Sequence, residues 1–362
     1  MYGNPLNTTP YFAELSKKGL FYERCFTPLY GTARGVWATI TGVPDVSLTK
    51  TASRNPAAVD QRTIINDFKD KEKFYFIGGS TSWANIRGVL TNNIDGLHLY
   101  EEQDYKAPKI DVWGISDKHL FLEANDILAK QQKPFFAIIQ TSDNHRPYTI
   151  PDEDLKEFQK KNIPKDSLLK YGFASVEEYN AFRYTDFTFK KFMEAAAKEK
   201  YFENTLFVFV GDHGIRGDAG NMFPRSWTDQ GLTTVHVPLL FYYPKQLQPQ
   251  SYKIPASQLD ILPTIAGIAG ISYTNTTLGK DLLSVGKEKY AFIMDPDIRQ
   301  VGVADSLYYY NYKLNSGQQS ISYLESNDPV KVDKATLDRY KSITTAFYES
   351  SRYLLLNNKK KK

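Results

Sequence analysis

The sequence predicts an α/β fold of three layers, in which helices cover both faces of a sheet. Continuous apolar segments alternate with longer helical segments through most of the 362 residues, as in sheets that are covered on both faces. The pattern changes near Leu278, after which short aromatic-rich segments such as "SLYYYNYKL" appear. We therefore expect a main domain over residues 1–277, and a small antiparallel sheet with a terminal helix over residues 278–362.

The expected strands of the main sheet are the apolar segments 73–79, 134–142, 205–212 and 236–244. The segments between them carry helix signals. Thr9 precedes Pro10, the arrangement of a helix N-cap followed by proline at the first helical position. Ser175 and Glu178 have the spacing of a capping box. A last helix is expected from Lys334 onward.

Composition excludes several classes of function. Lys and Arg total 45 against 41 Asp and Glu, a net charge of +4, and no basic stripe interleaved with aromatic residues indicates a nucleic-acid partner. Cys25 is the single cysteine, so the sequence predicts neither a disulfide framework nor a thiolate metal site. No apolar run of about 18 residues predicts a membrane-spanning helix.

Asp212 and His213 stand at the end of the apolar segment "TLFVFVGDHG". Ligands of open α/β sheets bind beyond the carboxyl ends of strands, and a carboxylate with a neutral imidazole suits a divalent cation. The flanking glycines are expected to let both side chains face one point. A hydrogen-bonded Asp–His pair that closes a strand would give the same dipeptide.

Thr32 follows Gly31 at the start of an expected helix that Gly42 and Pro44 end. A hydroxyl at a helix N-terminus lies where backbone N–H groups favour an anion. A bound metal would lower the pKa of that hydroxyl and make it a nucleophile. Ordinary N-capping by Thr32 is the alternative interpretation.

Two further strand ends carry candidate substrate ligands. His145 follows the segment 134–142 and could hold a substrate oxygen or protonate a leaving alkoxide; a surface-loop histidine is the alternative. Trp83 and Arg87 follow the segment 73–79, where an aromatic wall and a guanidinium fork suit a phosphate or sulfate ester. A core-packed tryptophan beside a solvated arginine would also fit that segment.

These motifs together resemble a known family. The blocks "NTTPYFAELSKKG", "GTARGVWATITG", "DNHRPYT" and "GDHG" are similar to the sulfatase-like branch of the alkaline phosphatase superfamily, and within it to lipoteichoic acid synthase-like phosphoglycerol transferases. The similarity covers roughly residues 1–283 and implies an alkaline phosphatase-like three-layer sheet.

The resemblance also implies roles for the candidate residues. Thr32 takes the place of a metal-bound nucleophile, and Asp212 and His213 take the place of its metal ligands. His145 takes the place of a histidine that contacts the substrate headgroup, and Trp83 and Arg87 are expected to complete the headgroup pocket. By analogy the metal is Mn²⁺, with Zn²⁺ or Mg²⁺ as alternatives.

The sequence departs from the family pattern in three places. Cys25 is followed by "FTPL", which lacks the Ser-Arg pair of the sulfatase motif, and Thr32 cannot become formylglycine. Ile77 and Gly78 stand where related synthases often carry a histidine. Met1 comes after the point where a family strand should already have supplied a metal-binding Glu or Asp. We therefore expect a fragment whose full-length protein has an N-terminal membrane anchor.

The resemblance implies a transferase that moves a phosphoglycerol-type or phosphoethanolamine-type headgroup from a phospholipid donor to a glycan or lipid acceptor hydroxyl. The expected location is the extracytoplasmic face of the cell membrane. Two alternatives remain: a phosphodiesterase or sulfatase-like hydrolase with the same site, and an inactive glycan- or lipid-binding fragment.

Overall fold

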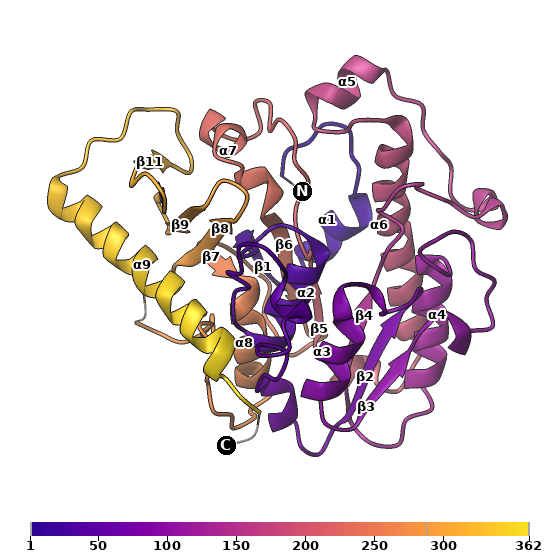
Figure 1. Ribbon diagram of the computed structural model, residues 1–362. Coiled ribbons are helices and arrows are strands. Elements are labelled where there is room, and N and C mark those ends of the chain that lie inside the picture. The colour runs from indigo at the N-terminus through magenta and orange to yellow at the C-terminus, as the bar shows by residue number, and fades with distance from the viewer. Residues whose placement is uncertain (1, 287, 361–362) are drawn as a thin grey trace.

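The computed structural model describes residues 2–286 and 288–360, and its elements alternate along the chain as expected (Figure 1). The helices are α1 (Pro10–Ser16), α2 (Thr32–Thr41), α3 (Ile86–Asn93), α4 (Asp117–Leu128), α5 (Lys165–Lys170), α6 (Val176–Ala196), α7 (Arg225–Asp229), α8 (Ile261–Ile268) and α9 (Lys334–Asn357). The strands are β1 (Leu20–Phe26), β2 (Glu72–Ile77), β3 (Leu97–Tyr100), β4 (Phe135–Gln140), β5 (Phe207–Val210), β6 (His236–Tyr242), β7 (Gln250–Ser257), β8 (Ala291–Asp295), β9 (Gln300–Ala304), β10 (Tyr308–Lys313) and β11 (Gln319–Tyr323).

The strands of the main domain form two sheets, in the orders β5-β6-β1-β7 and β3-β2-β4. β2 pairs in parallel with both β3 and β4, whereas β6 runs antiparallel to β1 and β5. β4 and β5 are each the outermost strand of their sheet. All six residues of β4 are only half-buried, although five of the six in its neighbour β2 are buried. In the described chain, the main domain therefore holds two half-sheets.

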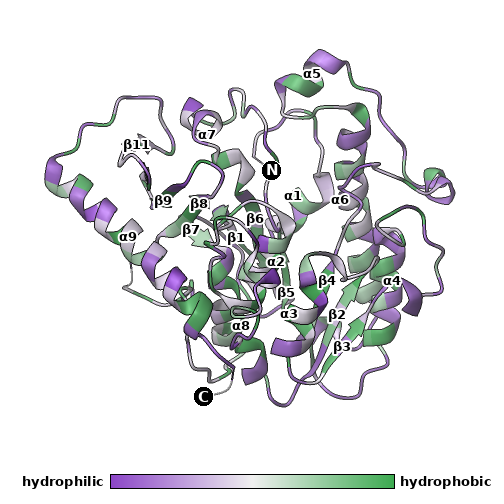
Figure 2. Ribbon diagram, in the orientation of Figure 1, coloured by the Kyte–Doolittle hydropathy of each residue, from purple (hydrophilic) through white to green (hydrophobic). Residues whose placement is uncertain are grey.

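The same helices cover both half-sheets. On one face, α1, α4 and α6 pack through Phe12, Phe121 and Phe192 against apolar side chains of β4, β5 and β6. On the other face, Ile265 of α8 packs against the core beneath β2 and β4 and also against the core beneath β1, β5 and β6. Figure 2 shows the strands as mostly apolar and the outer faces of the helices as more polar. The predicted α/β/α layering is confirmed.

The sequence signals located four strands and several helix ends correctly. The apolar segments 134–142, 205–212 and 236–244 contain β4, β5 and β6, the segment 73–79 covers all of β2 except Glu72, and Pro10 opens α1. Ser175 accepts a hydrogen bond from the Glu178 N–H at 3.1 Å, as a capping residue should. β1, β3 and β7 were not predicted.

The C-terminal residues form the expected antiparallel sheet, in the order β11-β10-β9-β8, with α9 across one face. Tyr340 and Tyr348 of α9 share a core with the sheet and with Trp37 of α2. On the other face Tyr309 packs in a second core with Trp227. The two parts of the chain are thus joined by buried side chains. Within the described residues, we find no helix that combines the length and apolar character needed to cross a bilayer.

Candidate active site

A cavity of about 1140 Å³ opens at the carboxyl ends of β4 and β5. Four of the predicted site residues, Thr32, Asp212, His213 and His145, line this cavity. They come from the start of α2, the end of β5 and the end of β4. Convergence of strand ends and a helix N-terminus is the usual location of a ligand site in an α/β fold.

Thr32 is not an N-capping residue. The N-cap position of α2 is Gly31, whose positive φ of 98° suits glycine, and no side chain caps the helix. Thr32 is the first helical residue, and its Oγ1 lies 3.3 Å from His213 Nε2. The hydroxyl therefore faces the cavity at the N-terminus of a ten-residue helix, where an anion is favoured.

His213 is held in one orientation by its own backbone. Its Nδ1 lies 2.6 Å from the carbonyl oxygen of Gly214, and because a carbonyl only accepts, Nδ1 carries the proton. Nε2 of the neutral ring is then a lone-pair donor directed at the Thr32 hydroxyl. Asp212 Oδ2 lies 3.6 Å from the same Nε2, and the Tyr30 ring packs edge-on against the imidazole at 4.6 Å between centroids.

Glycines bring these groups together by allowing close backbone contact. A Cβ atom at Gly35 would lie 2.3 Å from the Asp212 carbonyl oxygen, so the first turn of α2 packs directly on the end of β5. A Cβ at Gly214 would lie 2.2 Å from the Thr233 carbonyl oxygen. The glycines beside Asp212 and His213 thus serve tight packing, which corrects the expectation that they let the backbone turn towards one point.

The donor atoms fit an open divalent metal site in type and spacing. Two ligands that each lie about 2.1 Å from a tetrahedral ion are about 3.4 Å apart, close to the 3.3 and 3.6 Å separations around His213 Nε2. Across residues 2–286 and 288–360, no group of three His, Cys, Asp or Glu side chains gathers as a metal site. A metal bound at this point would take the Thr32 hydroxyl as its third donor.

Gln258 also lines this cavity. Its Nε2 donates to the carbonyl oxygens of Gly211 and Asp212 at 2.9 and 3.0 Å, which ties the end of β5 to the segment before α8. Its Oε1 is buried and has no hydrogen-bond partner among the described residues. A buried amide oxygen without a partner, on a residue that lines the cavity, is consistent with a site that binds a cation.

His145 faces the cavity from the half-sheet of β4. Its Nδ1 donates to the Ser142 carbonyl oxygen at 3.2 Å, which leaves the lone pair on Nε2. The Trp113 ring packs against the imidazole with 4.4 Å between centroids, and Trp113 Nε1 donates to the Arg146 carbonyl oxygen at 2.7 Å. The histidine is therefore fixed in tautomer and covered on one side.

The structure does not bring Trp83 or Arg87 to this cavity. Arg87 Nη2 lies 2.8 Å from both carboxylate oxygens of Glu101, a side chain that is 5% exposed. Trp83 packs on the core between α2, α3 and α8. Both positions match the structural alternatives given above, because the loop after β2 turns its side chains towards β3 and the helix layer.

Trp113, Arg146 and Arg216 line the cavity instead. Trp113 lies in an irregular segment that follows no predicted strand, so no local signal marks it as a site residue. Arg216 lies three residues after His213 in "DHGIRG", and this proximity to the metal-ligand motif was a usable signal. The two exposed arginines place positive charge at the cavity mouth, where an anionic ester would enter.

Cys25 has no access to this chemistry. It lies within β1 at 0% exposure, and burial raises the pKa of its thiol well above the ordinary value. A buried, protonated thiol cannot act as a nucleophile in the folded chain.

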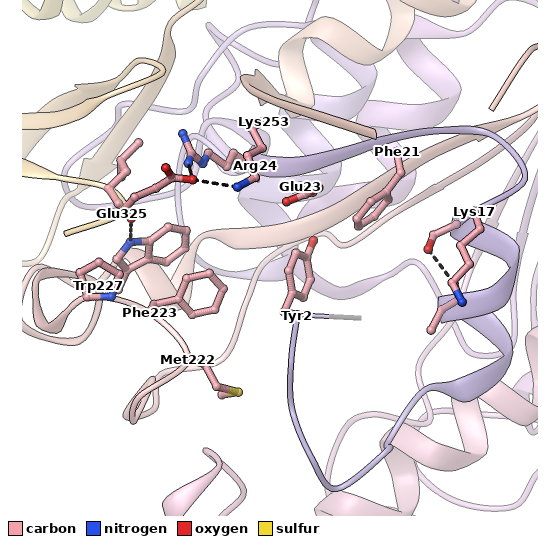
Figure 3. Close-up of a pocket in the computed structure, with 14 residues that line it drawn as sticks. Tyr2, Lys17, Phe21, Glu23, Arg24, Met222, Phe223, Trp227, Lys253 and Glu325 are labelled. Carbon is pink, nitrogen blue, oxygen red and sulfur yellow. Dashed lines mark hydrogen bonds and ion pairs between the residues drawn. The ribbon is translucent and has the colours of Figure 1, made fainter. Parts of the chain in front are cut away.

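A second cavity of about 760 Å³ adjoins the first, because Tyr2, Met222 and Phe223 line both. Figure 3 shows its aromatic side chains beside the Arg24, Lys253 and Glu325 cluster, and the Tyr2 hydroxyl points towards Glu23. That hydroxyl is buried and has no hydrogen-bond partner among the described residues. The second cavity thus combines aromatic faces with polar groups.

Comparisons with known proteins show which family the chain belongs to. A model of the Sulfatase family matches residues 1–271. The chain is 28% identical over 218 residues to the lipoteichoic acid synthase of Staphylococcus saprophyticus, covering 56% of this chain and 31% of that protein. It is 26% identical over 193 residues to the lipoteichoic acid synthase-like YvgJ of Bacillus subtilis, covering 50% of this chain and 30% of that protein. The chain thus matches about a third of the length of these curated relatives.

Solved structures share the fold over nearly the whole chain. The lipoteichoic acid synthase LtaP of Listeria monocytogenes superposes with a TM-score of 0.79 at 17% identity, over 97% of this chain and 86% of that one. An alkaline phosphatase superfamily protein of Vibrio parahaemolyticus superposes with a TM-score of 0.75 at 22% identity, over 97% and 83% of the two chains. At these identities the likeness supports the fold alone.

Proposed function

Because the chain belongs to the sulfatase family, we propose that it is the catalytic part of a metal-dependent transferase that uses Thr32 as its nucleophile. The donor is a phospholipid with a phosphoglycerol-type or phosphoethanolamine-type headgroup, and the acceptor is a glycan or lipid hydroxyl. A lipid donor places the reaction at a membrane surface. The side that we propose, by the resemblance, is the extracytoplasmic one.

One observation carries the proposal. The Thr32 hydroxyl lies at the N-terminus of α2 and within 3.3 Å of an imidazole lone pair that an aspartate also approaches. A threonine that merely capped the helix would direct its oxygen at backbone N–H groups, which this one does not do.

Asp212, His213 and Thr32 would hold the ion, with Mn²⁺ expected and Zn²⁺ or Mg²⁺ as alternatives. When bound, such a cation lowers the pKa of the hydroxyl and offsets the negative charge of the phosphoryl group. The chain itself fixes the direction of attack, because Gly35 holds the first turn of α2 against Asp212. The N-terminal amides of α2 favour the anionic group beside Thr32.

In the first step the Thr32 Oγ1 forms a bond to phosphorus, and the bond from phosphorus to the lipid oxygen breaks. Thr32 loses its proton, and the lipid oxygen gains one. His145 has a free Nε2 in the same cavity and is the group that we assign to hold or protonate that oxygen. In the second step an acceptor hydroxyl loses its proton and its oxygen forms a bond to the phosphorus of the phosphothreonine. The bond from phosphorus to Thr32 Oγ1 breaks, and that oxygen regains a proton.

The residues around the cavity fit a headgroup of this kind. Trp113 and Tyr30 give apolar walls, and Arg146 and Arg216 supply positive charge in place of Arg87. The adjoining second cavity gives an acceptor a place to approach the phosphothreonine. Trp83 and Arg87 have no part in this proposal, since neither lines the cavity.

The experiment is donor turnover on vesicles that contain phosphatidylglycerol or phosphatidylethanolamine, with Mn²⁺ added and diacylglycerol release measured. We expect Thr32→Ala to reduce release by roughly a thousandfold or more, as loss of a nucleophile does in other covalent mechanisms. Thr39→Ala is the matched control, because Thr39 lies on the same helix and lines the same cavity. Equal loss in both variants would count against a nucleophilic role.

Two further measurements separate the alternatives. Diacylglycerol release without any acceptor would favour a hydrolase with the same site, whereas release that depends on an added acceptor would favour the transferase. Metal content after soaking in Mn²⁺ and desalting should be about one ion per chain and should fall in Asp212→Ala. No release and no retained metal would favour the inactive binding fragment.

A further inference from the structure

Two buried carboxylates hold the loop after β4 that carries Ser142 and His145 into the cavity. Asp117, the first residue of α4, accepts the Ser142 N–H on Oδ1 at 2.8 Å and the Asp143 N–H on Oδ2 at 3.0 Å. Asp143 returns the contact by accepting the Asp117 N–H at 2.8 Å. Asp117 and Asp143 are 1% and 6% exposed. We call this reciprocal pair the carboxylate clasp.

The clasp acts on His145 through one residue. The Ser142 carbonyl oxygen accepts both the backbone N–H of His145 at 3.0 Å and its Nδ1–H at 3.2 Å. The orientation and tautomer of the imidazole therefore depend on where the Ser142 peptide lies. Asp117 holds the backbone on both sides of Ser142, because it accepts the Ser142 N–H and the Asp143 N–H. Among the described residues, the only other side chain seen to bond this backbone is that of His145 itself.

Two more contacts close the loop from the outside. The Thr185 hydroxyl of α6 donates to Asn144 Oδ1 at 2.9 Å. Trp113 covers the imidazole face and donates to the Arg146 carbonyl oxygen. The loop is thus held between α4, α6 and Trp113, and the clasp is its buried anchor.

The cost of the clasp indicates a purpose beyond ordinary capping. Burial opposes the charge on both carboxylates and each charge opposes the other, although Ser116 already caps α4 by accepting the His119 N–H with its side chain. The loop also presents the Ser142 hydroxyl to the cavity, where its oxygen is buried with no hydrogen-bond partner among the described residues. Such an unpaired group suits a ligand hydroxyl or ester oxygen.

We propose that Asp117 and Asp143 are positioning residues that set Ser142 and His145 as one side of the headgroup site. The inference rests on the proposed role of His145 in the transfer reaction. Asp117 needs both of its carboxylate oxygens, because each of them accepts one backbone N–H. Asp143 needs a single acceptor oxygen.

This asymmetry gives a sharp test by substitution with the isosteric amide. Asp117→Asn replaces one acceptor oxygen by an NH₂ group, so one loop N–H loses its partner. Asp143→Asn keeps an acceptor oxygen and removes one of the two opposing charges. Asp143→Ala removes the acceptor altogether. Asp126→Asn, at an exposed position of α4, is the matched control.

The four variants are compared by diacylglycerol release from phosphatidylglycerol vesicles, by retained Mn²⁺, by thermal unfolding, and by hydrogen exchange of the loop amides. We expect kcat to fall about tenfold or more in Asp117→Asn and Asp143→Ala, with retained Mn²⁺ unchanged. Asp143→Asn should stay within about threefold of the parent chain, as should Asp126→Asn. The Ser142 and Asp143 amides should exchange faster in Asp117→Asn alone among the asparagine variants.

The outcomes separate this inference from the proposed function. If the parent chain releases no diacylglycerol, the proposed function fails, and the amide exchange pattern still decides whether Asp117 holds the loop. Equal kcat in the parent chain and Asp117→Asn would overturn the inference while leaving the transferase intact. If Asp117→Asn does not fold, the comparison of Asp143→Asn with Asp143→Ala tests the inference instead. An equal loss of kcat in these two variants would also overturn the inference.

Discussion

Individual polar side chains in this molecule act through hydrogen bonds of one or two specific atoms. His213 is an example, because its Nδ1 proton is committed to the Gly214 carbonyl oxygen and only Nε2 is left for Thr32 or a metal. Asp186 is another: it accepts the Tyr11 and Phe12 N–H groups at 2.9 and 2.7 Å and so caps α1. In both cases the hydrogen-bond partner of the side chain is a backbone group.

Asp117 gives a pH-dependent prediction at this scale. Burial raises the pKa of its carboxyl from 3.8 to about 7, so the folded chain binds that proton more tightly than the unfolded chain. The free energy of unfolding should therefore fall as pH rises from about 4 to about 7, since the ionised form is disfavoured only in the fold. Asp117→Asn should flatten this decline.

Urea unfolding at several pH values from 4.5 to 8 checks the prediction, with Asp126→Asn as the control. Asp143 also faces Asp117 and its pKa is raised by burial and then by the charge of Asp117, so part of the slope should remain in the variant. An unfolding free energy that rises across this range in the parent chain would contradict the argument.

The sequence predicted the residues whose positions carry a local signal. Thr32, Asp212, His213 and His145 follow a strand end or open a helix, and all four line the cavity. Asp117 and Trp113 could not be predicted in the same way, because their partners lie 25 or more residues further along the chain. Trp83 and Arg87 also follow a strand end. The ion pair of Arg87 with Glu101 shows that this position in the sequence does not determine where the side chain points.

At the scale of elements, the contact between α2 and β5 determines the site. Gly35 lies inside α2, where alanine would normally stabilise a helix by about 1 kcal/mol. Here the added Cβ would lie 2.3 Å from the Asp212 carbonyl oxygen, so Gly35→Ala should push the first turn away from β5. We expect a lower thermal midpoint, weaker Mn²⁺ retention and a large loss of turnover.

Gly88→Ala in α3 is the control for that variant. Its Cβ would meet the end of the Asn85 side chain and no backbone atom, so the chain should keep Mn²⁺ and turnover. Thermal unfolding curves and the metal content of the two variants test this prediction. Normal metal retention in Gly35→Ala would show that the close contact is not needed for the site.

The strands that were missed share a physical reason. β1 reads "LFYERCF" and contains two charged residues, although it lies inside its half-sheet. Arg24 is stabilised by an ion pair with Glu325, about 300 residues later, and no local rule provides that partner. β3 has only four residues and β7 carries a lysine and a proline, so neither forms a continuous apolar segment.

At the scale of the whole molecule, the two half-sheets are the dominant feature. Backbone hydrogen bonds stiffen each half, whereas the described residues show no strand pair between β4 and β5. Side-chain packing under the shared helices joins them. We therefore expect slow relative motion of the halves to exceed motion within either half.

A pair of spin labels tests this expectation. Labels at the exposed positions Gln132 and Glu203 lie just before β4 and β5, whereas labels at Glu203 and Lys245 lie within one half. The first pair should give the broader distance distribution. Cys25 is buried and should not react with the label. Equal widths for the two pairs would show that the packing is as rigid as paired strands.

The division also runs through the site. Thr32, Asp212 and His213 lie with the half-sheet of β5, whereas Ser142 and His145 follow β4 on the other half. The distance from the nucleophile Thr32 to the headgroup ligands Ser142 and His145 therefore depends on the apolar packing that holds the two half-sheets together. Core substitutions at Phe192 of α6 or Ile265 of α8, which pack under the sheets and do not line the cavity, would then change which headgroups fit.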